Sequence, residues 1–356
     1  MRLSVPNIPP AILASAALRN DPIVSPSEAV QRISSFLSSG RTAVLTGAGV
    51  SVDSGVKAYR GKDGRYMHPD YKPIFYQELI EDSLRGHSFR QRYWLRAYIG
   101  FLPVRRTFPN STHYALAALQ HVGVVGPLIT QNVDGLHRAA LRRVLTEPEI
   151  DRRILELHGS IFKVHCQHGH VYPRAVFQDW LGQANPRWRE FLAELERTGT
   201  QPKTNPDGDV VLDDSVSYDD FVVPKCPSCD AEGRRNSIIK PDFVFFGESI
   251  SQEVKDRSYR TVEVADRLFV LGTTLATYSA FRLLKHALEL RKPVLLLNVG
   301  PTRADGLPGV DKLEIPTGVV MTDVVHTIVG TRAHNDPALR DILLSDVVKE
   351  VVEQAV

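Results

Sequence analysis

Four short apolar runs recur along the chain, each followed by a turn rich in glycine or small polar residues. They cover residues 42–46, 124–130, 267–272 and 293–299, and helix-like stretches separate them. A short continuous apolar run is typical of a buried parallel strand. Strands that alternate with helices predict an α/β fold with a Rossmann-like, doubly wound parallel sheet. A first helix is expected between Ser25 and Ser38, because a capping serine, a proline and a glutamate follow one another at its start.

The pattern changes between the second and third of these runs. Residues 159–235 hold all three cysteines, a helix-like stretch and an aspartate-rich loop, which predicts a small module inserted into the larger fold. The expected organisation is an N-terminal tail or presequence (1–24), a Rossmann-like domain (25–158 and 236–330) with a helical insertion at about 61–112, the small module (159–235), and a C-terminal helix and tail (331–356).

Composition narrows the class of protein. Lys and Arg total 43 against 41 Asp and Glu, a net charge of +2, and this balance argues against direct nucleic-acid binding. No apolar run approaches the ~18–20 residues that cross a bilayer, so no membrane partner is expected. Arg2 and Arg19 precede the first acidic residue, Asp21. That order permits a presequence and a mitochondrial matrix location, whereas the prolines nearby leave a plain tail, in a nuclear or cytoplasmic protein, as the alternative.

The first apolar run leads into a glycine-rich turn, TGAGVSVDSGVKAYR (46–60). Gly47 and Gly49 allow a close approach of the backbone that a Cβ would block. Ser51 is placed to cap a helix, whose N-terminal N–H groups attract a pyrophosphate. The spacing is not G-x-G-x-x-G, and no acidic residue for a ribose follows about 20 residues later. By itself, the turn fits a structural role as well as a nucleotide site.

Three further segments also carry polar residues at the ends of predicted strands or domains. They are TQNVDGLH (130–137), ELHGS (156–160) and the pair GTTLATYS (272–279) and LNVGPTR (297–303). Ligands of open α/β sheets bind at the carboxyl ends of the strands. These segments therefore predict a dinucleotide laid across the point where the strand order reverses.

Taken in order, and with KPDFVFFGE (240–248) and a Cys-x-x-Cys, these motifs resemble those of the sirtuins, the NAD-dependent protein deacylases, over about residues 25–329. The variants RQRYWLRAYIG (90–100), NPDGDV (205–210) and NVGPTR are similar to the class II sirtuins, which include a mitochondrial lipoamidase and ADP-ribosyltransferase. The resemblance implies a deacetylase, or a longer-acyl deacylase or lipoamidase, that yields nicotinamide, deacylated lysine and O-acyl-ADP-ribose. Protein ADP-ribosyl transfer is an additional activity it suggests. The implied partners are NAD and acyl-lysine proteins, and the expected oligomeric state is a monomer.

The resemblance also implies roles for individual residues. His158 is expected to be the base that deprotonates a ribose hydroxyl, with an ordinary pKa near 6.5. Asn132 would position the ribose and a water, and Asp134 would bind the nicotinamide carboxamide. The edge segment that pairs with substrate peptide corresponds to Val244, Phe245, Phe246 and Gly247. The remaining NAD-binding positions are Gly47, Ala48, Gly49, Ser51, Tyr59, Arg60, Gln131, Gly272, Thr274, Gly300 and Thr317, with Thr273, Ser279, Asn298 and Arg303 on the adenosine side.

Sirtuins hold a structural zinc ion with two Cys-x-x-Cys pairs. Here Cys226 and Cys229 form one pair, but the other reads HCQHGH (165–170) and contains only Cys166. Because tetrahedral zinc accepts imidazole as well as thiolate, one zinc held by the three cysteines and a histidine is expected. His168 is slightly preferred to His170 as the fourth ligand. Loss of the metal, or a redox role for Cys-x-x-Cys, are the alternatives.

One departure from the family pattern concerns the nicotinamide pocket. Lys57 and Ala58 stand where sirtuins usually carry Pro-Asp. This keeps open a catalytically weak NAD- and zinc-binding regulatory module. An NAD-dependent dehydrogenase is a further alternative, which the missing ribose-binding acid disfavours. No Tyr-x-x-Arg follows Arg60, so a preference for succinyl-lysine is not expected.

Overall fold

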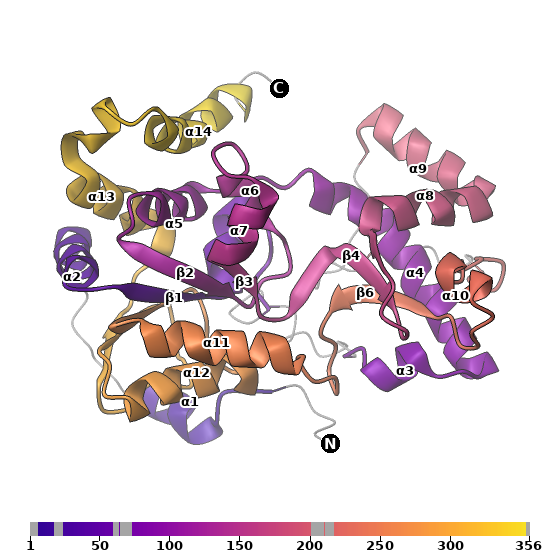
Figure 1. Ribbon diagram of the computed structural model, residues 1–356, viewed down its shortest axis with the longest axis horizontal. Coiled ribbons are helices and arrows are strands. Elements are labelled where there is room, and N and C mark those ends of the chain that lie inside the picture. The colour runs from indigo at the N-terminus through magenta and orange to yellow at the C-terminus, as the bar shows by residue number, and fades with distance from the viewer. Residues whose placement is uncertain are drawn as a thin grey trace. The chain divides into compact units, whose positions relative to one another are not determined.

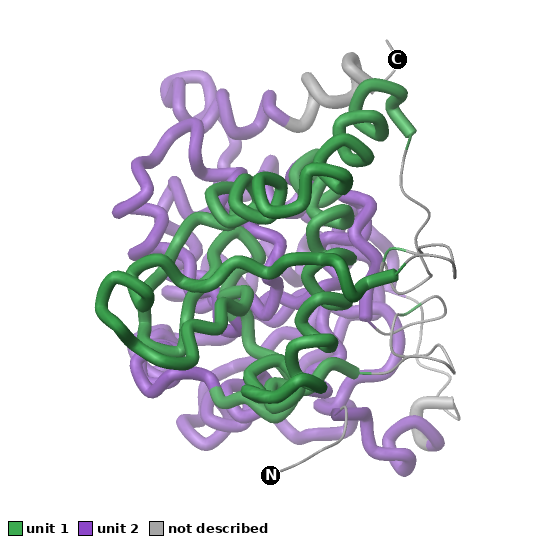
Figure 2. Tube along the Cα trace, turned by 90° about the vertical axis from the view of Figure 1, so that its right-hand side faces the viewer, with its two compact units in different colours: residues 1–5, 62–107, 159–249 green, residues 6–61, 108–158, 250–356 purple. Residues whose placement is uncertain are grey.

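The computed structural model describes residues 6–17, 24–59, 64, 73–200, 210 and 217–353, and the chain divides into two compact units (Figure 2). Unit 1 comprises residues 1–5, 62–107 and 159–249, and unit 2 comprises residues 6–61, 108–158 and 250–356. Arg60 and most of NPDGDV lie outside the described residues. In the part that is described, no helix is long and apolar enough to cross a membrane.

Unit 2 is built on a six-stranded, wholly parallel sheet in the order β3-β2-β1-β7-β8-β9. Figure 1 labels β1, β2 and β3. The predicted Rossmann-like fold is confirmed, and the four apolar runs correspond to β1, β2, β7 and β8. The order reverses between β1 and β7, which pair residue by residue from Thr42–Arg267 to Thr46–Leu271. Ligands of such sheets bind at this reversal. The strands are β1 (Thr42–Thr46), β2 (Val125–Thr130), β3 (Ile154–Glu156), β7 (Arg267–Leu271), β8 (Val294–Leu297) and β9 (Val310–Leu313).

Helices cover both faces of this sheet, which explains why its strands are apolar throughout rather than alternating. On one face, Val44 and Phe269 belong to a core that they share with α2, α5, α13 and α14 (Figure 1). On the other face, Leu45 and Val270 belong to a core that they share with α11 and α12. Side chains of a strand point alternately to its two faces, so both sets are buried. The helices of unit 2 are α1 (Pro10–Ala17), α2 (Pro26–Ser38), η1 (Ala48–Ser54), α5 (Ser111–His121), α6 (Leu136–Leu141), α7 (Glu147–Arg153), α11 (Gln252–Val264), α12 (Tyr278–Glu289), α13 (Thr317–Val329), η3 (Gly330–His334) and α14 (Pro337–Glu353).

Unit 1 has a small antiparallel sheet in the order β5-β4-β6, packed with helices around an aromatic core. Trp94 lies edge-on to Phe177 at 4.7 Å between ring centroids and donates a hydrogen bond to the carbonyl of Ile239 at 3.3 Å. Residues 236–249, expected in the Rossmann-like domain, group with unit 1 because β6 pairs with β4. Its elements are α3 (Tyr76–Ile80), α4 (Leu84–Arg105), β4 (Gly159–Cys166), β5 (Val171–Pro173), α8 (Arg174–Ala184), α9 (Pro186–Thr198), α10 (Pro227–Ala231) and β6 (Ile239–Phe243).

The loops that leave β1 and β7 touch through their backbones. The N–H of Gly49 donates to the carbonyl of Gly272 at 2.8 Å. A Cβ on Gly49 would lie 2.7 Å from that same oxygen, and one on Gly272 would lie 2.6 Å from the nitrogen of Val50. Gly272 also has φ +56°, which favours glycine. Two of the glycines in the sequence motifs are therefore required by the crossing of these loops.

We expect Gly49→Ala to lower the free energy of unfolding by about 1–3 kcal/mol, because the added methyl group overpacks the crossing. Gly126→Ala is the matched control, since its Cβ would meet its nearest neighbour, the carbonyl of Thr42, at 3.4 Å. Urea denaturation of both variants measures the difference. Equal stabilities would contradict the steric argument.

Candidate active site and metal centre

The predicted amide and carboxylate after β2 meet the serine of the glycine-rich turn. Asn132 Nδ2 donates to the carbonyl of Gly47 at 3.1 Å and to Ser51 Oγ at 3.0 Å. Ser51 Oγ in turn donates to Asp134 Oδ2 at 2.8 Å. Asn132 is 5% exposed and Ser51 is fully buried. Both of these bonds use the Nδ2 of Asn132, and its Oδ1 accepts no hydrogen bond from the described residues, so this oxygen stays available at the carboxyl edge of the sheet.

Asp134 is shifted toward its protonated form. Burial raises the pKa of this carboxyl above its usual range, while hydrogen bonds from the N–H of Leu136 and the hydroxyl of Ser51 act to lower it. The N–H of Leu136 lies 3.0 Å from Asp134 Oδ1. A carboxyl group held in this way can pair with the N–H₂ or the carbonyl of a carboxamide.

The amide of Gln131 forms hydrogen bonds to residues at the ends of neighbouring strands, so its polar atoms already have partners within the protein. Its Nε2 donates to the carbonyl of Thr46 at 3.2 Å and to Thr273 Oγ1 at 2.9 Å, and its Oε1 accepts from Thr277 Oγ1 at 3.0 Å. These bonds link the ends of β1, β2 and β7. The predicted NAD-binding residues Gln131 and Thr273 therefore fix the edge of the sheet where the ligand is expected.

His158, the predicted base, has both ring nitrogens engaged. Its Nδ1 lies 3.2 Å from the carbonyl oxygen of Gln131, and its Nε2 lies 2.7 Å from Ser279 Oγ. Burial lowers the pKa of His158 to about 4; the Gln131 carbonyl acts to raise it, and the charge of Arg282 lowers it further. At neutral pH this imidazole is uncharged and can accept a proton. The expected adenosine-side position of Ser279 differs from this placement against His158.

Most of the remaining predicted nucleotide positions lie after β7, β8 and β9, and three others lie in the turn after β1. Asn298 Nδ2 donates to the carbonyl of Val299 at 2.8 Å, and the Arg303 guanidinium lies 4.8 Å from the ring centroid of Phe281. Thr317, in the first turn of α13, accepts from Thr112 Oγ1 at 3.0 Å. Backbone hydrogen bonds hold two of these positions: the carbonyl of Thr274 accepts from the N–H of Arg303, and the N–H of Gly300 donates to Glu314. Gly47 and Ala48 lie at the start of η1. Tyr59 is the last described residue before Arg60.

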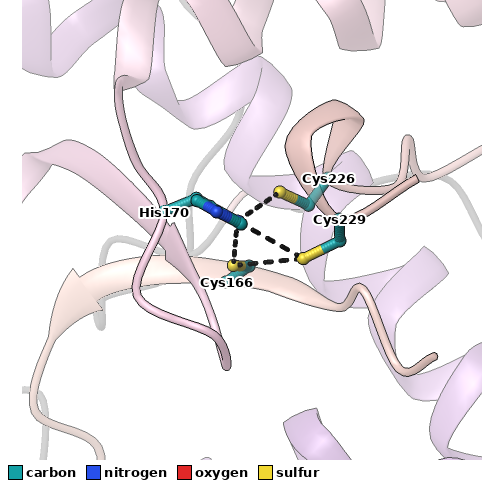
Figure 3. A group of neighbouring side chains, drawn as sticks. All are labelled: Cys166, His170, Cys226 and Cys229. Atoms are coloured by element: carbon teal, nitrogen blue, oxygen red, sulfur yellow. Dashed lines mark hydrogen bonds between the residues drawn. The ribbon is translucent and has the colours of Figure 1, made fainter. Parts of the chain in front are cut away.

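Unit 1 brings three thiols and one imidazole together (Figure 3). His170 Nδ1 lies 3.4 Å from the sulfurs of Cys166 and Cys229 and 3.5 Å from that of Cys226, and the sulfurs of Cys166 and Cys229 are 3.6 Å apart. Tetrahedral zinc, with Zn–S of ~2.3 Å and Zn–N of ~2.0–2.1 Å, requires S···N of about 3.5 Å and S···S of about 3.8 Å. The four side chains therefore fit one zinc ion.

The chemistry of the thiols also fits a bound cation. Burial and the neighbouring thiols Cys226 and Cys166 raise the pKa of Cys229 to about 12. Burial acts to raise the pKa of Cys226 as well, but hydrogen bonds, led by that from Tyr172, lower it to about 7. Three thiolates side by side repel one another, and a divalent cation removes this cost.

A model of the Sir2 family matches residues 47–279. The chain belongs to the Sir2 family. The resemblance to sirtuins is thus confirmed, and the matched range spans the glycine-rich turn, His158 and the metal centre. The family model ends at Ser279, so the segment LNVGPTR falls beyond it.

Individual relatives cover most of this sirtuin. It is 39% identical to the "NAD-dependent protein deacylase SIR4" of Batrachochytrium dendrobatidis, over 81% of this chain and 90% of that protein. It is 34% identical to the "NAD-dependent protein deacylase SRT2" of Arabidopsis thaliana, over 85% of this chain and 76% of that protein. A solved structure described as a Sir2 homolog–NAD complex has the same fold, with a TM-score of 0.56 and 23% identity over 84% of this chain and 93% of that one.

The preference for His168 as the fourth zinc ligand is wrong. His168 is exposed, and its Nε2 lies 2.9 Å from the carbonyl of Arg235. The reason is a tight turn at Gly169, which has φ +87°. The N–H of Gly169 bonds to the carbonyl of Cys166, and the N–H of Cys166 bonds to the carbonyl of His170. The turn therefore folds His170, and not His168, back over Cys166.

The predicted peptide-binding segment of this sirtuin is held by a buried ion pair within unit 1. Lys240 Nζ lies 3.2 Å from Glu248 Oε1, and Glu248 Oε2 accepts from the N–H of Phe245 at 3.0 Å. Phe246 forms a parallel bridge with Phe75. The bridge at Phe246 and the hydrogen bond at Phe245 thus fix the backbone within the segment from Val244 to Gly247, and Gly247 has φ +80°.

One buried histidine next to the site was not singled out from the sequence, although it ends the TQNVDGLH motif. His137 is 4% exposed and its Nε2 lies 2.9 Å from Thr46 Oγ1. Its ring centroid is 4.7 Å from that of His113. The Nε2 of His113 lies 3.4 Å from Ser51 Oγ. Burial lowers the pKa of His137 to about 3. The neutral histidine supports the turn that carries the site.

Acid should destabilise the protein through His137. Its folded pKa lies below the ordinary 6.5, so the unfolded chain binds more protons between these values and the stabilisation is lost as pH falls from 6.5 toward 3. At pH 5 the loss is about 2 kcal/mol relative to pH 8. We expect His137→Gln to reduce this pH dependence in urea denaturation. His326→Gln, at an exposed position, is the control, and equal pH dependence in both variants would refute the assignment.

The metal centre gives a second prediction. We expect the purified protein to contain one zinc per chain, and His170→Ala to lose most of it and to melt at a lower temperature, since such metal binding is coupled to folding. His168→Ala should keep the metal. Glu232→Gln should weaken zinc binding by about 10–100-fold, because Glu232 Oε1 lies 3.1 Å from His170 Nε2 and orients the ring.

Zinc content by mass spectrometry, with competition by a chelator, measures all three variants. Metal loss in His168→Ala and retention in His170→Ala would reverse the ligand assignment.

Proposed function

We propose that this sirtuin removes acyl groups from protein lysines, with NAD as co-substrate, and releases nicotinamide and O-acyl-ADP-ribose. The observation that carries the proposal is the uncharged His158 imidazole, which contacts the carbonyl of Gln131. The next residue, Asn132, begins the Asn132–Ser51–Asp134 chain at the edge where the strand order reverses. Relatives named as NAD-dependent protein deacylases support it. Unit 2 supplies the NAD site and unit 1 the metal centre and the peptide-binding segment.

Bound NAD supplies an electrophilic ribose carbon from which nicotinamide departs, and the chain's own groups do the rest. Gly47 and Gly49 let the backbone approach the pyrophosphate, since neither carries a Cβ. Asp134 pairs with the carboxamide, and Asn132 offers its Oδ1 to the ribose or a water. The carbonyl oxygen of the acyl-lysine is the nucleophile.

His158 then serves as general base. The carbonyl of Gln131 holds the hydrogen on Nδ1, so the lone pair that takes up the proton of a ribose hydroxyl is the one on Nε2, which faces Ser279 Oγ. The oxygen freed in this way would then be the group that accepts the acyl chain. Because burial keeps the pKa of His158 low, the imidazolium gives its proton up readily when the lysine leaves.

For the acyl group, we propose a class II specificity, for acyl chains longer than acetyl or for lipoyl groups, with protein ADP-ribosyl transfer as a second reaction. The class II variants RQRYWLRAYIG and NVGPTR support this choice, and the absence of Tyr-x-x-Arg after Arg60 disfavours succinyl-lysine. A panel of acetyl-, lipoyl-, long-chain- and succinyl-lysine peptides, read by mass for O-acyl-ADP-ribose, ranks the substrates. Strong succinyl activity would overturn it.

We expect His158→Ala to lower steady-state nicotinamide release by about 10²–10⁴-fold, the usual contribution of a general base, while NAD binding measured by calorimetry persists. His326→Ala, on an exposed face of α13, is the control. A regulatory module without catalysis would release no nicotinamide even in the unaltered protein, and a dehydrogenase would form reduced nicotinamide. Unchanged release in His158→Ala would overturn the assignment of the base.

A further inference from the structure

The catalytic imidazole makes a second contact that general-base chemistry does not require. His158 Nε2 and Ser279 Oγ are 2.7 Å apart, a shorter contact than the 3.2 Å from Nδ1 to the Gln131 carbonyl. Ser279 is half-buried and makes no other hydrogen bond among the described residues. The Ser279 hydroxyl thus contacts the Nε2 of His158 and is itself partly exposed to solvent.

The direction of this hydrogen bond follows from the partner of the other nitrogen. A carbonyl oxygen only accepts, so His158 Nδ1 carries the hydrogen that bonds to Gln131. In the neutral ring Nε2 is then an acceptor, and Ser279 must donate its O–H to it. The lone pairs on Ser279 Oγ remain open to a hydrogen bond from another hydroxyl.

The position of Ser279 suits a group that exchanges protons. It is the second residue of α12, which begins at Tyr278, so the N-terminal end of the helix stabilises negative charge that develops on Oγ. The next residue, Ala280, is fully buried, as are Leu283 and Leu284, in the core beneath β7 and β8. This packing fixes the hydroxyl relative to the strand ends.

Other groups near the ring set its charge but do not transfer protons. Arg282, one turn further along α12, disfavours the imidazolium, and the Gln131 carbonyl on the loop after β2 favours it. Both lie on unit 2, as do His158 and Ser279. Only Ser279 combines contact with Nε2 and an exchangeable proton among these groups.

We propose that Ser279 relays the proton from the substrate hydroxyl to His158. In one step the O–H bond of that hydroxyl breaks as its proton reaches Ser279 Oγ, while the original Ser279 proton passes to His158 Nε2. The products are an imidazolium, an intact serine and a nucleophilic oxygen, so atoms and charge balance without a further reagent. The relay rests on the proposed deacylase function. Ser279 also holds the ring, and this makes it a positioning residue as well.

The test compares Ser279→Ala and Ser279→Thr with the unaltered protein and His158→Ala. Two rates are measured: exchange of labelled nicotinamide into NAD in the presence of acyl-peptide, which precedes the base, and formation of O-acyl-ADP-ribose, which needs it. We expect Ser279→Ala to keep the exchange rate within about twofold and to lower product formation by at least about tenfold. Ser279→Thr should restore most of it, because threonine keeps the hydroxyl.

The pH profile is a second readout. Removing a donor to the neutral ring raises the pKa of His158, so the acid limb of product formation in Ser279→Ala should move to higher pH. Tyr278→Phe, at the preceding exposed position of α12, is the control for disturbance of the helix and should leave both rates and the profile unchanged.

Parallel loss of both rates in Ser279→Ala, or no change in either, would overturn the relay while His158→Ala still tests the enzyme. Failure of threonine to recover the rate would overturn it too. If the unaltered protein makes no O-acyl-ADP-ribose from any acyl-peptide, the proposed function fails, and the relay fails with it.

Discussion

Two backbone loops pass so close together at the ends of β1 and β7 that no side chain fits between them. The hydrogen bond from Gly49 to Gly272 joins the loops after β1 and β7. These two strands are far apart in the sequence, since their first residues, Thr42 and Arg267, are separated by 225 positions. This contact places Ser51 and Asn132 on one side of the sheet edge and Thr273 and Ser279 on the other. The amide of Gln131 and the ring of His158 also bond to residues that follow β7, namely Thr273 and Ser279.

The fold was readable from the sequence because both faces of the parallel sheet are covered. A strand buried on two faces is apolar throughout, so β1, β2, β7 and β8 stood out. The short strands β3 and β9 did not, since three or four residues such as Ile154–Glu156 carry too little pattern. Residues 236–249 were expected in the Rossmann-like domain but group with unit 1, because the pairing of β6 with β4 is a long-range contact that local pattern does not encode.

The candidate site divides in the same way. Residue identity and the order of the motifs were enough to name His158, Asn132 and Asp134 as candidates. Which neighbours each side chain would contact was not readable: Ser279 lies against the imidazole, and Gln131 is engaged on all sides of its amide. The choice between His168 and His170 depended on a left-handed glycine at position 169, and a turn of that kind changes which residue points inward without changing the list of candidate ligands.

Replacing a thiol by an imidazole in the metal centre also alters its electrostatics. Three thiolates and a neutral ring around a divalent ion leave a single excess negative charge, whereas four thiolates would leave two. Glu232 contacts the outer nitrogen of His170, and Arg234 lies 2.5 Å from Glu232. An acidic and then a basic side chain therefore lead from the metal centre to solvent. The small unit thereby holds its metal with less mutual repulsion among the ligands, and with one fewer sulfur for an oxidant to attack.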